Sequence, residues 1–353
     1  MDKYIVSIII PVYNGANSGL EKCLKSIIEQ EILEKEIIII DDCSEDDSLK
    51  IIKLTLGNTN VDYTIINHEN NQGLSASLND GLNISRGLYK LIIQQDCALT
   101  EKSELLESIE YMQNNEIKVL IGTPHIVFNL LSDYQKLFKI RISESSNTKK
   151  GDNRTQITQL KCDIFKSEIF SIIGDFDTTH KTIGQDFILS SRLFINNIDM
   201  YTFEKFNFII YYEGERTMKS VCLKEFRYAV AVPYISSIWR KNKFLKGSSD
   251  IQTKYKAKER FLNILFPSFF LLDLLLYIIY NNNIILYSIF IILVGWLARA
   301  LSRTIPVFWK ADKKWKVLFY SMAYILTDFF YSIGFMVGIT YVIRIYVSKK
   351  SAV

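Results

Sequence analysis

Residues 89–99 read YKLIIQQDCAL. The first five residues are mostly bulky and apolar, a pattern that predicts a buried strand over 89–93. This strand runs directly into two glutamines and a lone aspartate, Asp96. Because a carboxylate is costly to bury without a partner, its position at the end of a core strand indicates a role in binding.

Strand and helix patterns alternate along the chain before this strand. Residues 6–10 (VSIII), 36–40 (EIIII) and 61–67 (VDYTIIN) predict three further strands. Apolar residues at helical spacing follow the first two strands, over 20–29 and 47–56. Uniformly apolar strands are typical of a sheet covered on both faces. The alternation therefore predicts an α/β fold with a largely parallel central sheet.

Polar groups follow all four predicted strands where each strand ends. In open parallel sheets, ligands bind in the crevice at the carboxyl ends of the strands. Any one of these groups alone is ordinary turn chemistry, but their coincidence at four strand ends predicts a ligand-binding crevice. The candidates are Pro11, Tyr13 and Asn14, then Asp41 and Asp42, then Asn71 and Gly73, and finally Gln94, Gln95 and Asp96.

The chain has neither a G-x-G-x-x-G nor a Walker A sequence, which argues against glycine-fingerprint dinucleotide binding and P-loop binding of ATP. A diphosphate bound without a glycine cradle needs another source of positive charge, and a divalent cation held by a carboxylate is the usual substitute. Asp96 is the candidate ligand for Mg²⁺ or Mn²⁺, with phosphate oxygens and water completing the octahedron.

Four segments resemble, in order and spacing, the family 2 glycosyltransferases of GT-A fold. They are SIIIPVYNG, IIIIDDCSEDDS, NQGLSASLNDGLNISRGLYK and QQD, and the resemblance covers about residues 4–215. It implies that Tyr13 and Asp42 hold the nucleotide base. The family's D-x-D motif, which meets ribose and metal, corresponds to residues 94–96, where Gln94 replaces the ribose-side aspartate and Asp96 is kept.

A second motif follows in IGDFDTTHKTIGQDFILSSRLF, residues 173–194. The resemblance implies that Asp186 is the catalytic base, and Gln185 and Arg192 are candidates for the acceptor site. An acceptor hydroxyl needs such a carboxylate to take its proton as it attacks. The alternative role for Asp186 is a helix N-cap. A histidine that is sometimes a third metal ligand in the family is missing, with Glu213 as a possible substitute.

The C-terminal third contains long apolar runs. Residues 261–280 and 284–298 are separated by three asparagines, a pattern that predicts a transmembrane helical hairpin. A third run, 317–347, would be about 46 Å long as a helix, against about 30 Å for a bilayer core. It is therefore either one long tilted helix or two short arms bent near Gly334 and Gly338. A soluble protein with a large helical core is the alternative to a membrane protein.

Basic residues predict the orientation of these helices. The segments 240–260 and 299–316 are strongly basic and flank the hairpin, whereas the chain up to Trp239 carries eight more acidic than basic residues. Because basic flanks stay in the cytoplasm, we expect the large N-terminal body to be cytoplasmic. Lys349 and Lys350 favour the bent form of the last run for the same reason.

The stretch before the hairpin resembles the amphipathic segment of membrane-attached family members that make exopolysaccharides or lipid-linked glycans. A plain helical linker is the alternative. We expect a GT-A domain over 1–220, a basic interfacial segment over 221–260 and transmembrane helices over 261–353. Lipid would face Phe226, Tyr234, Ile238 and Trp239, and anionic headgroups would meet Arg240, Lys241 and Lys243.

These observations predict an integral membrane glycosyltransferase with no nucleic-acid partner. It would move a sugar from a UDP or dTDP donor to a hydroxyl of a lipid-linked sugar or glycan, with Mg²⁺ or Mn²⁺, and the resemblance implies inversion. Two alternatives remain. A polyprenyl-phosphate glycosyl synthase would not need Asp186. A catalytically silent nucleotide-binding membrane protein would fit the two departures from the family's motifs, at Gln94 and at Gln185, which stands where the resemblance implies a glutamate.

Overall fold

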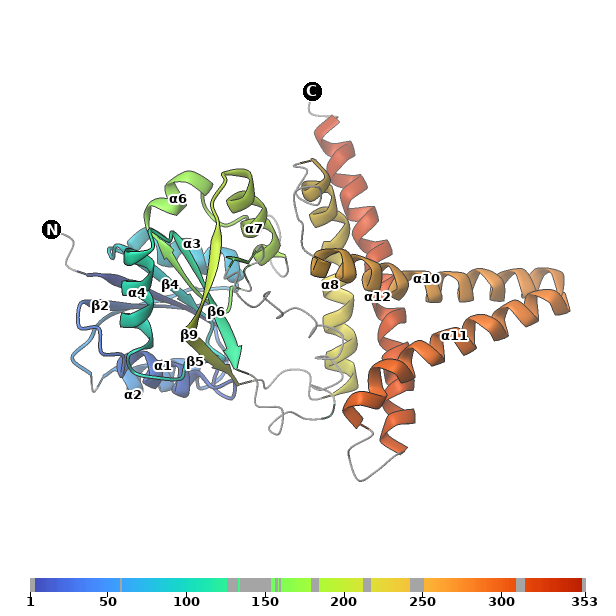
Figure 1. Cartoon of the computed structure of the whole chain (residues 1–353), viewed down its shortest axis with the longest axis horizontal. Coiled ribbons are helices and arrows are strands. Elements are labelled where there is room, and N and C mark those ends of the chain that lie inside the picture. The colour runs from blue at the N-terminus through green and yellow to red at the C-terminus, as the bar shows by residue number, and fades with distance from the viewer. Residues whose placement is uncertain are drawn as a thin grey trace. The chain divides into compact units, whose positions relative to one another are not determined.

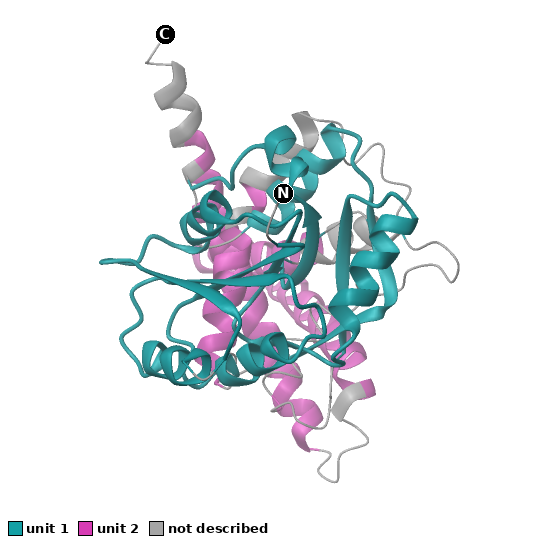
Figure 2. Cartoon of the chain, turned by 90° about the vertical axis from the view of Figure 1, so that its left-hand side faces the viewer, with its two compact units in different colours: residues 1–129, 147–213 teal, residues 130–146, 214–353 magenta. Residues whose placement is uncertain are grey.

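The protein folds into two compact units in a computed structural model (Figure 1). The first unit comprises residues 1–129 and 147–213, and the second comprises 130–146 and 214–353 (Figure 2). The structure describes residues 4–57, 59–125, 133, 154–155, 158, 160–178, 184–211, 217–241, 251–308 and 315–350.

A nine-stranded sheet forms the centre of the first unit, in the order β3-β2-β1-β4-β8-β6-β9-β5, with β7 pairing with β9. Strands β3, β2, β1 and β4 are parallel, whereas β8 is antiparallel to both β4 and β6. The predicted α/β fold is confirmed, and its parallel half consists of the first four predicted strands. The strands are β1 (Val6–Val12), β2 (Lys35–Asp41), β3 (Asp62–Asn67), β4 (Tyr89–Ile93), β5 (Cys97–Leu99), β6 (Val119–His125), β7 (Arg154–Thr155), β8 (Cys162–Lys166) and β9 (Met200–Ile210).

Two hydrophobic clusters cover the two faces of this sheet. One contains buried residues of α1, α2 and α4, and the other contains buried residues of α3, α6 and α7. Neighbouring residues of β2 alternate between the clusters, because successive side chains of a strand point to opposite faces. The helices are α1 (Leu20–Ile28), α2 (Ser48–Leu56), α3 (Leu74–Ile84), α4 (Glu104–Asn114), α6 (Glu168–Ile173) and α7 (Gln185–Ile195).

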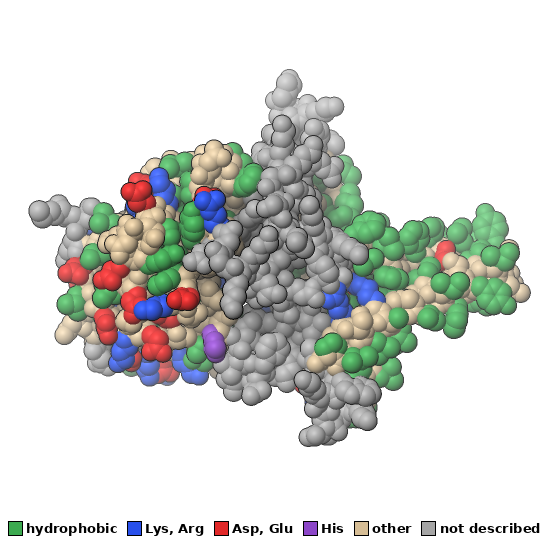
Figure 3. Space-filling model, in the orientation of Figure 1, with side chains coloured by type: hydrophobic (Ala, Val, Ile, Leu, Met, Phe, Trp, Pro, Cys, Tyr) green, Lys and Arg blue, Asp and Glu red, His purple; other side chains and the backbone are tan. Residues whose placement is uncertain are grey.

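The second unit is helical. Within the described residues its helices are α8 (Met218–Lys241), α10 (Ile251–Tyr280), α11 (Asn283–Phe308) and α12 (Trp315–Lys350). Within the described residues, three stretches are long and apolar enough to cross a membrane, namely 261–280, 283–306 and 315–340. Hydrophobic side chains cover the visible face of the α10–α11 hairpin (Figure 3), and many of them are exposed. The turn of this hairpin falls at the asparagines, as the sequence predicts.

The last apolar run is one continuous helix of 36 residues. Of the two predicted forms the structure has the single long helix, uninterrupted at the glycines, so the bent form that Lys349 and Lys350 favour is wrong. A Cβ atom on Gly334 would collide with the backbone carbonyl of Phe226 in α8, and one on Gly338 would collide with that of Val230. The two glycines therefore let α8 and α12 pack at close range, as small residues four apart do in membrane helices.

Helix α8 includes the first part of the predicted interfacial segment. Val221, Glu225 and Ala229 of this helix are buried, in line with its packing along α12. The side chains of Tyr234, Ile238, Trp239, Arg240 and Lys241, and the whole of Lys243, lie outside the part that the structure describes. The lipid-facing role of this segment therefore stays a prediction.

A buried polar cluster joins three of these helices. The Asp328 carboxylate of α12 accepts hydrogen bonds from the Trp296 indole at 2.8 Å and from the Arg299 guanidinium at 3.0 Å, both on α11. Arg299 also donates to the Asn263 side chain of α10 at 2.5 Å. Ionisable groups among apolar helices require such partners, so the cluster explains how the last apolar run accommodates an aspartate.

Candidate functional site

Gln95 connects the end of β4 to the end of β1. Its side-chain oxygen accepts a hydrogen bond from the Tyr13 backbone N–H at 2.9 Å, and its side-chain nitrogen donates to the Tyr13 carbonyl at 3.1 Å. A Cβ atom on Gly15 would lie 2.7 Å from the Gln95 side-chain oxygen. A side chain at position 15 would therefore displace the Gln95 amide from its contacts with Tyr13. Pro11 lies within β1, opposite Ile40 of β2.

The loop after β1 is also attached to the loop after β2. The backbone N–H of Asn14 donates to the Ser44 hydroxyl at 2.9 Å, and the Asn14 side chain accepts from the Glu45 backbone at the same distance. Gly15 donates to the Ser48 hydroxyl at 2.7 Å. Asn14 has a left-handed backbone with φ of 48°, a conformation that asparagine tolerates better than most residues.

The two aspartates at the end of β2, Asp41 within the strand and Asp42 just after it, have different partners. The Asp42 carboxylate accepts hydrogen bonds from the backbone N–H groups of Gln72 at 2.7 Å and Gly73 at 2.8 Å, and it also contacts His68 Nδ1 at 2.8 Å. It therefore holds the loop that leads into α3. Asp41 is equally buried, but its Oδ1 atom has no hydrogen-bond partner among the described residues. This buried oxygen is one of the few polar atoms left without a hydrogen bond inside the described part of the fold.

These contacts bring together most of the predicted strand-end residues. Tyr13 stays 48% exposed, so its ring is accessible to a ligand. Asn71 is exposed and lies in the loop between β3 and α3, next to the segment that Asp42 holds. Gln94 donates from its side-chain nitrogen to the Leu160 carbonyl at 2.9 Å. The roles of these residues toward a nucleotide stay predictions.

Asp96, the candidate metal ligand, forms an ion pair. The Lys161 ammonium lies 3.0 Å from Oδ1 and 2.9 Å from Oδ2 of this carboxylate. No group of three or more His, Cys, Asp or Glu side chains suited to a metal occurs among the residues that the structure describes. One carboxylate suits a cation held mainly by the phosphates of a ligand. Asp96 therefore fits that role once the ammonium has left it.

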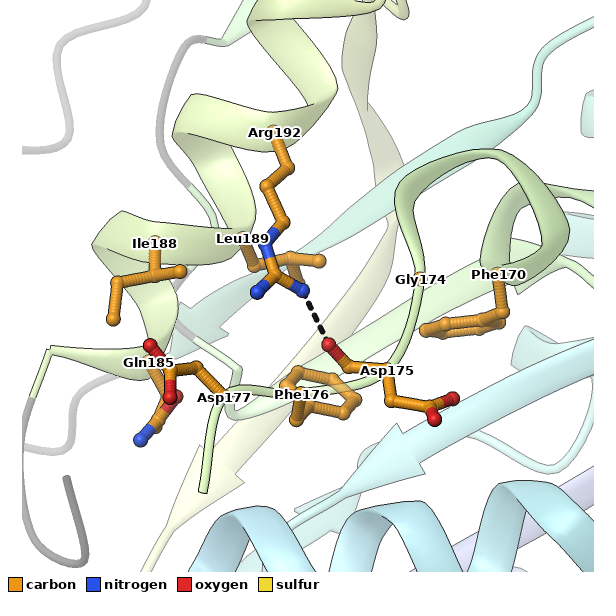
Figure 4. Close-up of a pocket in the computed structure, with 9 residues that line it drawn as sticks. All are labelled: Phe170, Gly174, Asp175, Phe176, Asp177, Gln185, Ile188, Leu189 and Arg192. Atoms are coloured by element: carbon orange, nitrogen blue, oxygen red, sulfur yellow. Dashed lines mark hydrogen bonds between the residues drawn. The ribbon is translucent and has the colours of Figure 1, made fainter. Parts of the chain in front are cut away.

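The G-D-F-D loop of the second motif is held from two helices. The guanidinium of Arg192 on α7 donates to the backbone carbonyl of Asp175 (Figure 4) and also to that of Ile173. The side-chain amide of Asn79 on α3 forms two hydrogen bonds with the Phe176 backbone, at 2.8 and 2.9 Å. The hollow that this loop and α7 line is too narrow for a water molecule. Arg192 thus has a positioning role here, and its acceptor-site role stays a prediction.

Asp186 lies in the first turn of α7, where a negative charge is favourable next to the helix N-terminus. The N-cap residue is Gly184, with φ of 101°, so Asp186 is not the N-cap that the alternative prediction made it. Its backbone carbonyl accepts from the Ser190 hydroxyl at 2.6 Å. Gln185 beside it is buried.

A further carboxyl group, Asp163 on β8, was not among the sequence candidates. The pKa of Asp163 is raised from 3.8 to about 7, mainly by burial and to a smaller extent by the charge of Asp186, although hydrogen bonds from Thr158, Leu160 and Gly122 lower it. The Thr158 backbone N–H also donates to the Ser190 hydroxyl on α7 at 3.1 Å. Asp163 is therefore linked through Thr158 to the helix that carries Asp186.

One further candidate and the histidines remain to be placed. Glu213, the substitute for a third metal ligand, and His180 lie outside the residues that the structure describes. His68 lies between two carboxylates, with Nδ1 2.8 Å from Asp42 and Nε2 2.9 Å from Asp80.

The fold and the linked strand ends define a GT-A type of domain. The solved structure of a mannosyltransferase from Pyrobaculum calidifontis, in complex with GDP-Man and Mn²⁺, has a TM-score of 0.56 to this chain. It shares 16% sequence identity, over 93% of this chain and 87% of that one. At this identity the likeness concerns the fold alone.

Residues 7–174 match the family model "Glycosyl transferase family 2", and this chain is a glycosyltransferase with a family 2 domain. The glycosyltransferase GlyG of Streptococcus pneumoniae is 23% identical over 217 residues, which span 57% of this chain and 71% of that protein. The cholesterol galactosyltransferase of Borreliella burgdorferi is 37% identical over 105 residues, 30% of this chain and 28% of that protein. The predicted family is therefore confirmed.

Proposed function

We propose that the protein transfers a sugar from a nucleotide-sugar donor to a hydroxyl of a lipid-linked sugar or glycan at a membrane surface. The observation that carries this proposal is the set of hydrogen bonds that tie the carboxyl ends of β1, β2 and β4 together through Gln95 and Asn14. This edge of a parallel sheet is where ligands bind. It also contains the carboxylates that such a donor needs.

The nucleotide would lie against the loops after β1 and β2. Tyr13 exposes its ring for contact with the base, and Asp41 or Asp42 would accept the N–H of a uracil or thymine ring, which favours UDP or dTDP. The mannosyltransferase of similar fold holds GDP-Man together with Mn²⁺, which supports a nucleotide sugar and a divalent cation as the donor system.

Asp96 would hold Mg²⁺ or Mn²⁺, because a single carboxylate suffices for a cation bound mainly by phosphate oxygens and water. When bound, the cation offsets the negative charge that develops on the leaving diphosphate. Asp186 would accept the proton of the attacking hydroxyl. Its place in the first turn of α7 favours the ionised form that a base requires. By family resemblance, the transfer would invert the anomeric centre.

The helical unit supports an acceptor that resides in a membrane. Its three long apolar stretches expose most of their side chains, and the Borreliella relative is named for transfer to cholesterol, a lipid. The basic segments around the hairpin favour a catalytic unit on the cytoplasmic side. A polyprenyl phosphate fits the same helices, so a polyprenyl-phosphate synthase is the second candidate. An anionic acceptor phosphate needs no base, and the two candidates therefore differ at Asp186.

The test is nucleotide release by the full-length protein in detergent, with a panel of nucleotide sugars and a membrane lipid extract, with and without Mn²⁺. Asp96→Asn and Asp186→Asn are compared with Asp199→Asn, a control on an exposed side chain outside the site. Mn²⁺-dependent release from one donor, lost in the first two variants and kept in the control, would support the proposal. Release that survives in Asp186→Asn would favour the synthase, and nucleotide binding without release from any donor would favour a silent binding protein.

A further inference from the structure

The ion pair between Lys161 and Asp96 places a positive charge where the donor's cation is expected. One ammonium bridges both oxygens of the carboxylate, at 3.0 and 2.9 Å. The side chains are 26% and 18% exposed for Lys161 and Asp96. The pair is thus reachable by a ligand, yet removed enough from water for its charges to interact strongly.

The fold holds Lys161 in this place through the neighbouring backbone. The Gln94 backbone N–H donates to the Lys161 carbonyl, and the Gln94 side chain donates to the Leu160 carbonyl, both at 2.9 Å. On the other side, the carbonyl of Asp96 accepts from the Tyr211 backbone N–H at 2.6 Å. Both members of the pair are therefore fixed at the end of β4, and the contact is not that of a mobile surface lysine.

A divalent cation and this ammonium exclude each other. Mg²⁺ binds a carboxylate oxygen at about 2.0–2.1 Å, and a second cation on the same carboxylate would repel it over a few ångströms in a partly desolvated site. Lysine is a compact charge on a flexible stem and a common ligand of phosphate. When displaced from Asp96, the ammonium can turn to a diphosphate bound next to it.

We propose that Lys161 is the resident counter-charge of Asp96 in the donor-free protein and that it passes to the nucleotide's diphosphate when donor and cation bind. The inference rests on the proposed function, because it assumes a nucleoside diphosphate at these strand ends. It assigns Lys161 two opposite effects. Lys161 weakens cation binding at Asp96 in the absence of nucleotide, and it strengthens diphosphate binding in the absence of a cation.

The first effect is tested by Mn²⁺ binding to the full-length protein in detergent without nucleotide, followed by the electron paramagnetic resonance signal of free Mn²⁺. We expect Lys161→Met to bind Mn²⁺ about tenfold more tightly than wild type. Lys166→Met, at the other end of β8, is the matched control and should not differ from wild type. Adding Asp96→Asn to Lys161→Met should remove the gain. Equal affinities in wild type and Lys161→Met, or no binding by Lys161→Met, would overturn the proposal.

The second effect is tested by titrating UDP and dTDP into the same proteins in EDTA, with uridine and thymidine as ligands that lack the diphosphate. Lys161→Met should weaken binding of the diphosphate by at least about fivefold and leave nucleoside binding unchanged, and Lys161→Arg should retain most of the affinity. Sugar transfer by the wild type together with unchanged Mn²⁺ and diphosphate binding in Lys161→Met would overturn this inference and leave the proposed function standing. If the wild type transfers sugar from no donor but Lys161→Met shows both binding effects, the proposed function is refuted and the inference about Lys161 stands.

Discussion

Replacing Asp163 by asparagine should remove a large part of the pH dependence of stability in the first unit (residues 1–129 and 147–213), here called the catalytic unit. The side chain is buried in β8, and burial raises its pKa to about 7 from 3.8. Between these two pH values the folded protein binds more protons at this group than the unfolded chain does. The free energy of unfolding therefore falls as the pH rises through this window.

The size of the effect follows from the two pKa values. A difference of about three units corresponds to about 4 kcal/mol over the whole window, of which about 2.5 kcal/mol falls between pH 5 and pH 8.5. An asparagine does not titrate in this range. The decrease in unfolding free energy between these two pH values should thus be about 2.5 kcal/mol smaller in Asp163→Asn than in wild type.

The assay must report the catalytic unit alone. All four tryptophans, at 239, 296, 309 and 315, belong to the helical unit. Tryptophan fluorescence therefore does not report unfolding of the catalytic unit. Pulse proteolysis in urea, with an immunoblot for an N-terminal tag, measures unfolding of the catalytic unit in the detergent-solubilised full-length protein. Protease amounts are matched at each pH on an unfolded substrate, and exposed Asp199→Asn is the control.

Asparagine can change the overall stability without affecting this test. The quantity compared between variant and wild type is only the change in unfolding free energy from pH 5 to pH 8.5. Parallel pH dependences in wild type and Asp163→Asn would refute the reasoning. They would show that Asp163 titrates in the folded protein much as it does in the unfolded chain.

Three further changes follow from the packing. Gly338→Ala should lower the thermal midpoint of the helical unit, since its Cβ meets a carbonyl of α8. Gly295→Ala on α11, whose Cβ would make only an ordinary contact with the Phe266 ring at 3.6 Å, should raise this midpoint by the equivalent of up to about 1 kcal/mol. Tryptophan fluorescence in detergent reports both changes. Asn79→Ala removes both hydrogen bonds to the Phe176 backbone and should cost about 2 kcal/mol, with faster amide hydrogen exchange over 174–178; unchanged exchange would contradict the anchoring role. Asp328→Leu leaves its arginine partner on α11 buried without a counter-charge and should destabilise the helical unit by about 3 kcal/mol or more, a loss that the same fluorescence would detect.

The sequence by itself determined the fold class, the family and the three long apolar helices. Each depends on local patterns, such as the uniformly apolar strand at 36–40, the aspartates after it and the unbroken run at 317–347. The apolar composition and the side-chain periodicity of a strand or a membrane helix depend on which of its faces are buried in protein or lipid. Both properties can therefore be read from the local sequence. The match of residues 7–174 to the family model agrees with this. For the last apolar run, only the structure decided between one long helix and two bent arms.

Only the tertiary structure decided which polar groups meet. Gln95 and Tyr13 are 82 residues apart, Lys161 and Asp96 are 65 apart, and Asn79 and Phe176 are 97 apart. Nothing in a local pattern separates a lysine at the start of a strand from one on the surface, or a buried Asp163 from an exposed one. A hydrogen bond or a pKa depends on distance and burial in space, and these are set by the order and register of strands that are far apart in the chain.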